Sequence, residues 1–158
     1  MYYDENGKRR STINNTGIFG FVGELIPLSN FGKSTIYLGG HYFPSVENAY
    51  QAAKSNDEAI RIKFMLLTPR DAQKQGQLNK VSNDWHKKKE DVMFFCLVQK
   101  FQDFEMRKLL LCTKDLYLEE TNDWGDQFWG VDWKSGEGNN VLGKQLMMIR
   151  SFCKKKDL

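Results

Sequence analysis

The sequence has 158 residues, of which 41% are hydrophobic, and 23 lysines and arginines face 20 aspartates and glutamates. A chain of this length is typical of one domain whose core needs no disulfide bonds. The near balance of charge argues against a protein whose main role is to neutralise many phosphates, although it is compatible with a small anionic ligand.

The cysteines and the apolar runs exclude further classes of protein. Cys96, Cys112 and Cys153 are odd in number and far apart, so we expect reduced, mostly buried thiols rather than a disulfide framework or a zinc site. The longest apolar run, VMFFCLV, is too short to span a membrane, and the amino terminus MYYDENGKRR is too polar for a signal peptide. We therefore expect a cytoplasmic protein, and nothing in the sequence calls for a metal or a cofactor.

The first part of the chain predicts a leader and a small sheet. Residues 1–16 are polar and without periodicity, and we expect a flexible leader before a single domain over residues 17–158. GIFGFVG, residues 17–23, alternates like a strand. STIYLGGHYF, residues 34–43, places two glycines between β-prone runs, as a tight hairpin requires.

Most of the remaining chain has helical patterns. The predicted helices cover residues 45–54, 57–67, 69–76, 83–101, 104–112 and 141–152. Ser45 is a good N-cap, Pro69 suits a first helical turn, and the long helix over 83–101 is expected to be the central one. LYLEE, residues 116–120, predicts a short strand. The fold class is therefore α+β, mainly helical, with a small antiparallel sheet.

The helix that follows Ser45 carries a polar and aromatic face. Glu47, Tyr50, Gln51 and Lys54 stand at i, i+3, i+4 and i+7, which places them on one side of the helix. Taken alone, Glu47 is equally explained as a partner of the helix dipole, and Lys54 as a solvated cation of the last turn. Together they put a carboxylate and a lysine on one face, which mere binding does not require.

The segment NDWGDQFWGVDWKSGEGNN, residues 122–140, holds three tryptophans and four carboxylates without any regular period. Trp124 and Trp129, with Trp85 earlier in the chain, are candidate walls for a flat base, since stacking on an aromatic ring contributes about 1–3 kcal/mol per base. Packing in the core is the alternative explanation for Trp85.

The end of this segment and the rest of the chain bear on phosphate binding. The amides at the start of the last helix are suited to a phosphate, and the alternative is that Asn139 or Asn140 only caps this helix. No glycine-rich phosphate loop follows a strand, so we discount a nucleoside triphosphatase.

Seven segments of the chain, in this order, carry a resemblance to a known family. They are LSNF at 28–31, YFPSVENAYQAAK at 42–54, NDWHKKKEDVM at 83–93, QKF at 99–101, LLCTKDLYLEE, WGDQFWG and GNNVLGKQLMMIR. They resemble successive motifs of the NADAR family from about Phe19 to Arg150. Members of this family are N-glycosidases. Some cleave phosphoribosylated pyrimidine intermediates of riboflavin synthesis, and others remove ADP-ribose from modified guanine in nucleic acid.

The resemblance implies an enzyme that breaks a ribose–nitrogen bond, and the chemistry needs particular groups. Positive charge develops on C1 of the ribose, so a carboxylate and a proton donor are required, and Glu47 and Asp126 are the candidates. Lys54 is the candidate for a Schiff-base intermediate with the ring-opened sugar. The expected substrate-binding residues are Asn30, Phe31, Tyr50, Trp85, Lys88, Trp124, Trp129, Gly130 and Asn139.

The chain departs from the family pattern at three places. Many relatives have a histidine where this chain has Asn48, a Gly-Arg pair where it has Gly76-Gln77, and Thr-Gly-Asp at residues 113–115. The arginine that is missing at Gln77 would be a forked donor suited to phosphate.

The resemblance leaves two classes of function open. The substrate of an enzyme would be a ribosylated nucleotide or ADP-ribosylated guanine, with transient nucleic-acid contact. The alternative is a non-catalytic protein that binds or sequesters an ADP-ribose-like nucleotide. Neither a membrane nor an obligate protein partner is indicated.

Overall fold

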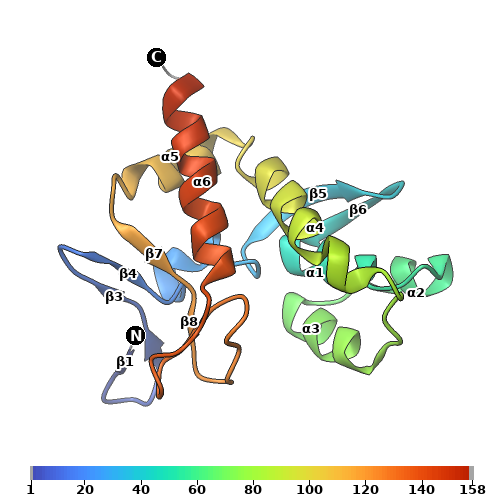
Figure 1. Cartoon of the computed structure of the whole chain (residues 1–158), viewed down its shortest axis with the longest axis horizontal. Helices are drawn as coiled ribbons and strands as arrows, with labels where there is room; N and C mark the ends of the chain where they lie inside the picture. Colours follow the sequence, from blue (N-terminus) through green and yellow to red (C-terminus); the bar gives the residue numbers. More distant parts are fainter. Residues whose placement is uncertain (1, 157–158) are drawn as a thin grey trace. The chain divides into compact units, whose positions relative to one another are not determined.

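The computed structural model describes residues 2–156, and the chain divides into two compact units (Figure 1). One unit joins the chain up to Ser29 with the chain from Phe104 onward, and the other unit is Asn30–Asp103. Helices and short strands occur in both units, which confirms the α+β class. The flexible leader over 1–16 and the single domain over 17–158 stay predictions.

The unit Asn30–Asp103 is a hairpin followed by four helices. Its elements are β5 (Lys33–Leu38), β6 (His41–Ser45), α1 (Val46–Ala53), α2 (Glu58–Lys63), α3 (Pro69–Leu78) and α4 (Trp85–Lys100). The predicted hairpin and all four predicted helices are confirmed. β5 and β6 pair antiparallel, and Gly39 and Gly40 both have positive φ, as a two-residue turn with the twist of the strands requires.

The central helix of this unit is α1, which contacts β5, β6 and the other three helices (Figure 1). Seven of its eight residues are buried, whereas only five of the 16 residues of α4 are. The expectation that the helix over 83–101 is central is therefore wrong. Apolar spacing identifies an amphipathic helix, but it does not identify a helix that buries polar residues as well.

Two helices of this unit do not end where the sequence predicts: α2 ends earlier and α3 ends later. α2 stops at Lys63, and beyond its end the buried side-chain amide of Asn48 donates to the carbonyl oxygens of Phe64 and Leu67, both at 2.8 Å. α3 continues past Gly76, which is buried inside the helix and does not end it.

Among its described residues, the other unit contains short strands, one 3-10 helix and two α-helices. Its elements are β1 (Tyr2–Tyr3), β2 (Arg9–Arg10), β3 (Thr12–Ile13), β4 (Gly17–Phe19), η1 (Gly23–Leu28), α5 (Phe104–Cys112), β7 (Tyr117–Glu119), β8 (Thr121–Asn122), β9 (Val131–Asp132) and α6 (Val141–Lys156). Both predicted helices and the predicted strand LYLEE are confirmed, and α6 extends beyond residue 152. The strand predicted over 17–23 is confirmed only over Gly17–Phe19, since η1 begins at Gly23.

The strands of this unit pair differently from the prediction of one antiparallel sheet. β4 pairs antiparallel with β3 but parallel with β7, and β8 is parallel to β9. In the unit Asn30–Asp103, β5 and β6 form a sheet of their own. Alternating side chains indicate that a strand has a buried face, but they do not specify its neighbour.

The structure also tests what the sequence predicts about the cysteines and about membrane-spanning segments. Cys96 is buried, which raises the pKa of its thiol to about 12, but Cys112 is exposed and Cys153 is half-buried, so most of the thiols are not buried. Within the described part of the chain, every helix is too short or too polar to traverse a lipid bilayer.

Candidate active site

The polar face of α1 begins at a regular helix cap. The Ser45 hydroxyl accepts a hydrogen bond from the amide of Asn48 at 3.1 Å, which confirms Ser45 as the N-cap. Three polar side chains of the helix, those of Glu47, Asn48 and Gln51, are nevertheless buried. Burying polar groups costs free energy unless they are bonded. Asn48 is bonded to two backbone carbonyl oxygens and has a structural role, which leaves Glu47 and Gln51 as the polar pair of interest.

The four predicted side chains share one face of α1. Gln51 Nε2 donates to Glu47 Oε1 at 2.6 Å, and Lys54 Nζ lies 5.5 Å from the centroid of the Tyr50 ring. Glu47 and Gln51 are each only 5% exposed. The carboxylate is thus held inside the unit by a donor from the next helical turn.

Lys54 is electrostatically coupled to Glu47. Burial lowers the pKa of Lys54, and the charge of Glu47 acts in the opposite direction. A lysine with a lowered pKa has a larger fraction of neutral amine, and only the neutral amine attacks an imine or carbonyl carbon. The pair therefore places a carboxylate and an amine of lowered pKa on one helix face, and the role of Lys54 as a nucleophile stays a prediction.

Asn30 adds a hydrogen-bond acceptor beside this face. Its carbonyl oxygen accepts from the amide of Glu47 at 3.1 Å, and its Nδ2 is 3.4 Å from Sδ of Met93. The Asn30 Oδ1 atom is buried without a hydrogen-bond partner among the described residues. Because buried polar atoms are normally paired, this oxygen is a candidate acceptor for a donor of a bound ligand.

The aromatic and cationic candidates of this unit occupy different environments. Trp85 is 4% exposed, and its ring lies 5.0 Å from that of Tyr50 at an angle of 59°, so much of the indole is covered by protein. Phe31 is half-buried. Lys88 forms a surface ion pair with Asp84 at 3.1 Å, one helical turn earlier. Their role in substrate binding stays a prediction.

In the other unit, the amino-terminal segment contacts two partly exposed indoles, Trp124 in the loop between β8 and β9 and Trp133 directly after β9. The Arg9 guanidinium lies 4.9 Å from the centroid of the Trp124 ring, and Tyr3 meets Trp133 edge-on at 6.1 Å. Arg9 Nη1 also donates to Asp123 at 3.0 Å, and the Tyr3 hydroxyl donates to the same carboxylate. Sequence reasoning missed Tyr3 and Arg9, because their segment has no periodicity and its partners lie more than a hundred residues away.

Asp126 shapes the same loop. Its Oδ1 accepts hydrogen bonds from the amides of Phe128 and Trp129, both at 3.0 Å. The completely buried side chain of Asn122 bonds to both backbone groups of Asp126, at 2.9 Å to its amide and 2.7 Å to its carbonyl. One carboxylate oxygen is thus engaged in loop structure, and a role for Asp126 in proton transfer stays a prediction.

Gly130, at the end of the loop between β8 and β9, is required by the close approach of two backbone segments. A Cβ atom on Gly130 would lie 2.1 Å from the carbonyl oxygen of Glu120, so only glycine allows this approach of two backbones. The Trp129 ring is half-buried and meets Phe128 edge-on at 5.0 Å. Contact of Gly130 or Trp129 with a substrate stays a prediction.

The start of α6 is bound by the loop rather than capped by an asparagine side chain. The amides of Val141 and Leu142 donate to the carbonyl oxygens of Phe128 and Trp129, at 3.3 and 3.0 Å. The Asn140 side chain instead accepts from Glu120 N at 3.0 Å and donates to Leu118 O at 2.9 Å. Two of the amides that the sequence offers to a phosphate are therefore already bonded, and Asn139 is exposed beside them.

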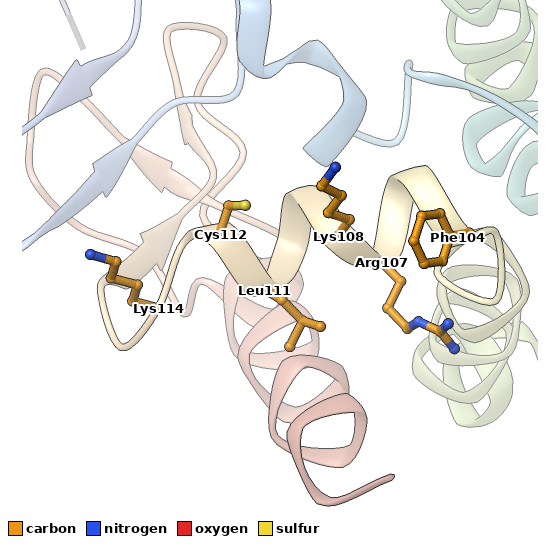
Figure 2. Close-up of a pocket in the computed structure, with 6 residues that line it drawn as sticks. All are labelled: Phe104, Arg107, Lys108, Leu111, Cys112 and Lys114. Carbon is orange, nitrogen blue, oxygen red and sulfur yellow. The ribbon is translucent and has the colours of Figure 1, made fainter. Parts of the chain in front are cut away.

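A hollow on α5 is a separate feature (Figure 2). It is lined by Phe104, Arg107, Lys108, Leu111, Cys112 and Lys114. Figure 2 shows the side chains of Arg107 and Lys108 leaving the helix in different directions. None of the predicted site residues lines this hollow.

A buried carboxylate beside a lysine of lowered pKa is typical of an enzyme site rather than of a structural core. The chain belongs to the NADAR domain family, whose model matches residues 20–153. This match confirms the resemblance that the sequence motifs predict.

The relatives include enzymes with assigned names. The N-glycosidase YbiA of Escherichia coli is 36% identical over 126 residues, which are 77% of this chain and 78% of YbiA. The NMR structure of that protein superposes with a TM-score of 0.79 at 31% identity, covering 92% of this chain and 89% of YbiA.

Longer relatives carry another name. The riboflavin biosynthesis protein VVA0006 of Vibrio vulnificus is 36% identical over 129 residues, which are 78% of this chain but 34% of that protein. This chain thus spans about a third of its length.

Proposed function

We propose that this chain is an N-glycosidase that hydrolyses the bond between C1 of a ribose and the nitrogen of a base. The observation that supports this proposal most is the buried pair of Glu47 and Gln51 on α1, with Lys54 of lowered pKa on the same face. Relatives that carry the name N-glycosidase give independent support.

In the proposed mechanism, Glu47 acts on the sugar carbon and on the protons around it. The carboxylate stabilises positive charge at C1 as the ring oxygen takes up a proton and the sugar opens to an imine with the base nitrogen. The neutral amine of Lys54 adds to C1, and the base leaves as an amine after accepting a proton. Water then adds to C1 of the lysine imine, which releases the sugar aldehyde and regenerates the lysine.

The chemical class of the base is the finer part of the proposal. A relative named for riboflavin biosynthesis favours a ribosylaminopyrimidine phosphate as the substrate. ADP-ribosylated guanine has the same ribose–nitrogen bond, and we keep it as the second substrate class. The buried, unpartnered Oδ1 of Asn30 suits either class, because both bases carry amino groups that donate hydrogen bonds.

The test is release of the base, measured by liquid chromatography and mass spectrometry. The pure protein is incubated separately with a ribosylaminopyrimidine phosphate and with DNA that contains ADP-ribosylated guanine. We expect Glu47→Gln to lower turnover about a hundredfold or more, the share that a positioned acid or base supplies.

Glu105→Gln is the matched control for this variant. Glu105 also lies in the first turn of a helix, but it is exposed. Both variants lose a first-turn carboxylate, so the control shows the effect of that change away from the candidate site. Binding of either compound without release of a base would identify a sequestering protein and would refute the proposal. Equal turnover of both variants would remove Glu47 from the mechanism.

A further inference from the structure

Gly76 occupies an unusual position for a glycine. It is buried in the interior of α3, two residues before the helix ends at Leu78, and no positive φ requires a glycine there. Alanine is the better helix former at such a position, so the helix gains nothing from this glycine. The reason for it must therefore lie in the neighbouring structure.

That neighbour is the side chain of Gln51. A Cβ atom on Gly76 would lie 1.9 Å from Oε1 and 2.6 Å from Cδ of Gln51, so the amide lies directly against the helix backbone. The space that a methyl group would fill is occupied by the Gln51 amide. Any larger residue at position 76 would have to displace it.

The position of the amide determines what its two ends do. Nε2 donates to Glu47 Oε1 at 2.6 Å, while Oε1 is buried without a hydrogen-bond partner among the described residues. A buried acceptor without a partner lowers stability. An apolar side chain would avoid that loss, but it would leave the Glu47 carboxylate without this donor.

We propose that Gln51 is a positioning residue that orients the Glu47 carboxylate, and that Gly76 is required because it leaves space for the Gln51 amide. This inference rests on the proposed function, since it assigns Glu47 to the reaction. It adds a third residue on α1 and one residue on α3 to the machinery of the site.

The first experiment compares Gly76→Ala with Gln75→Ala. The added methyl group must push the Gln51 amide away from Glu47, and a carboxylate misplaced by about 1 Å can cost about a hundredfold in rate. We expect kcat to fall tenfold to a hundredfold in Gly76→Ala, with KM within about twofold of the parent. Gln75→Ala changes an exposed residue of the same helix and should keep the parent kcat.

A double-mutant cycle then shows whether Gly76 acts through Gln51. In Gln51→Ala the space beside residue 76 is free, so adding Gly76→Ala should lower kcat no further. Gln51→Met, which keeps the length of the side chain but removes the donor, should show the same loss as Gln51→Ala. Full additivity of the two alanine variants, or a parent kcat in Gly76→Ala, would overturn the proposal.

A spectroscopic measurement decides the matter independently of turnover. In a nitrogen-15 NMR spectrum, the side-chain amide protons of Gln51 should exchange slowly with water in the parent. They should shift and lose protection in Glu47→Ala and in Gly76→Ala, but not in Gln75→Ala. If the parent releases no base from either compound, the proposed enzyme is refuted, and these signals still test whether Gln51 holds Glu47. Unchanged signals in Gly76→Ala would refute the inference.

Discussion

Two substitutions at Asp126 separate its role in the loop from a role in catalysis. Asp126→Ala removes the acceptor of two amide hydrogen bonds, whereas Asp126→Asn keeps an oxygen at the Oδ1 position and removes the negative charge. The structure of the loop should therefore tolerate asparagine at position 126. Catalysis should not, if Asp126 donates a proton or stabilises charge in the reaction.

The size of the difference follows from these two bonds. A hydrogen bond contributes about 1 kcal/mol net, and about 1.5–3 kcal/mol when one partner is charged, so losing both bonds in Asp126→Ala should cost about 3–6 kcal/mol. Asp126→Asn should cost only about 1 kcal/mol, because both bonds are kept in neutral form. In a chain of this size about 1 kcal/mol corresponds to about 2–4 °C in Tm, so the alanine variant should melt several degrees below the asparagine variant.

The assay combines thermal unfolding with release of the base. If Asp126 is also a catalytic acid, Asp126→Asn should lower turnover about a hundredfold while its Tm stays close to the parent. Parent turnover in this variant would assign Asp126 to the loop alone. Equal Tm values for the asparagine and alanine variants would refute the argument from the two hydrogen bonds.

Four further outcomes are expected. Borohydride added during turnover should fix a sugar fragment on Lys54, because reduction converts an imine into a stable amine; peptide mass spectrometry would refute the assignment by finding the fragment on Lys88. Burial holds the pKa of Lys54 in the folded state below the usual 10.5, so the unfolded chain binds this proton more tightly. The contribution of Lys54 to stability therefore rises with pH between its folded-state pKa and about 10.5. Lys54→Met should therefore melt above the parent at pH 7, and the difference should shrink towards pH 10.5; a constant difference would contradict this. Binding of a ribosylated nucleotide should quench tryptophan emission saturably. Trp129→Phe should weaken this binding more than it lowers Tm, which a fluorescence titration and a thermal unfolding curve would show. Lys114 has a φ of 52°, a backbone conformation that costs an L-residue roughly 1 kcal/mol. Lys114→Gly should therefore keep or raise Tm, and a fall of several degrees would show that the backbone at Lys114 is not strained.

The parts of the structure that the sequence predicts are those that depend on local rules. The face shared by Glu47, Gln51 and Lys54 follows from the period of a helix whose start is set by Ser45. The hairpin follows from Gly39-Gly40, because few other residues adopt two positive φ values in succession.

The parts that the sequence does not predict depend on contacts between distant residues. Asn48 bonds to the segment after α2, 16 and 19 residues later, and Asn140 bonds to residues 20 and 22 positions before it. A side-chain amide can bond to almost any backbone group, so its residue type does not indicate which one it meets. Nor does spacing show that α1 is buried on nearly every side, which is the feature that makes its polar residues informative.

The contact of Tyr3 and Arg9 with the loop between β8 and β9 has a practical consequence for recombinant work. Both residues lie before the stretch 20–153 that matches the family model, so a chain shortened to that stretch would lose them. Trp124 and Trp133 are already 50% and 41% exposed, and without the contacts of Arg9 and Tyr3 they would form an apolar surface that favours aggregation. Aggregation of such a shortened protein, or a drift in its tryptophan emission, would then report the missing amino-terminal residues and not the behaviour of the site.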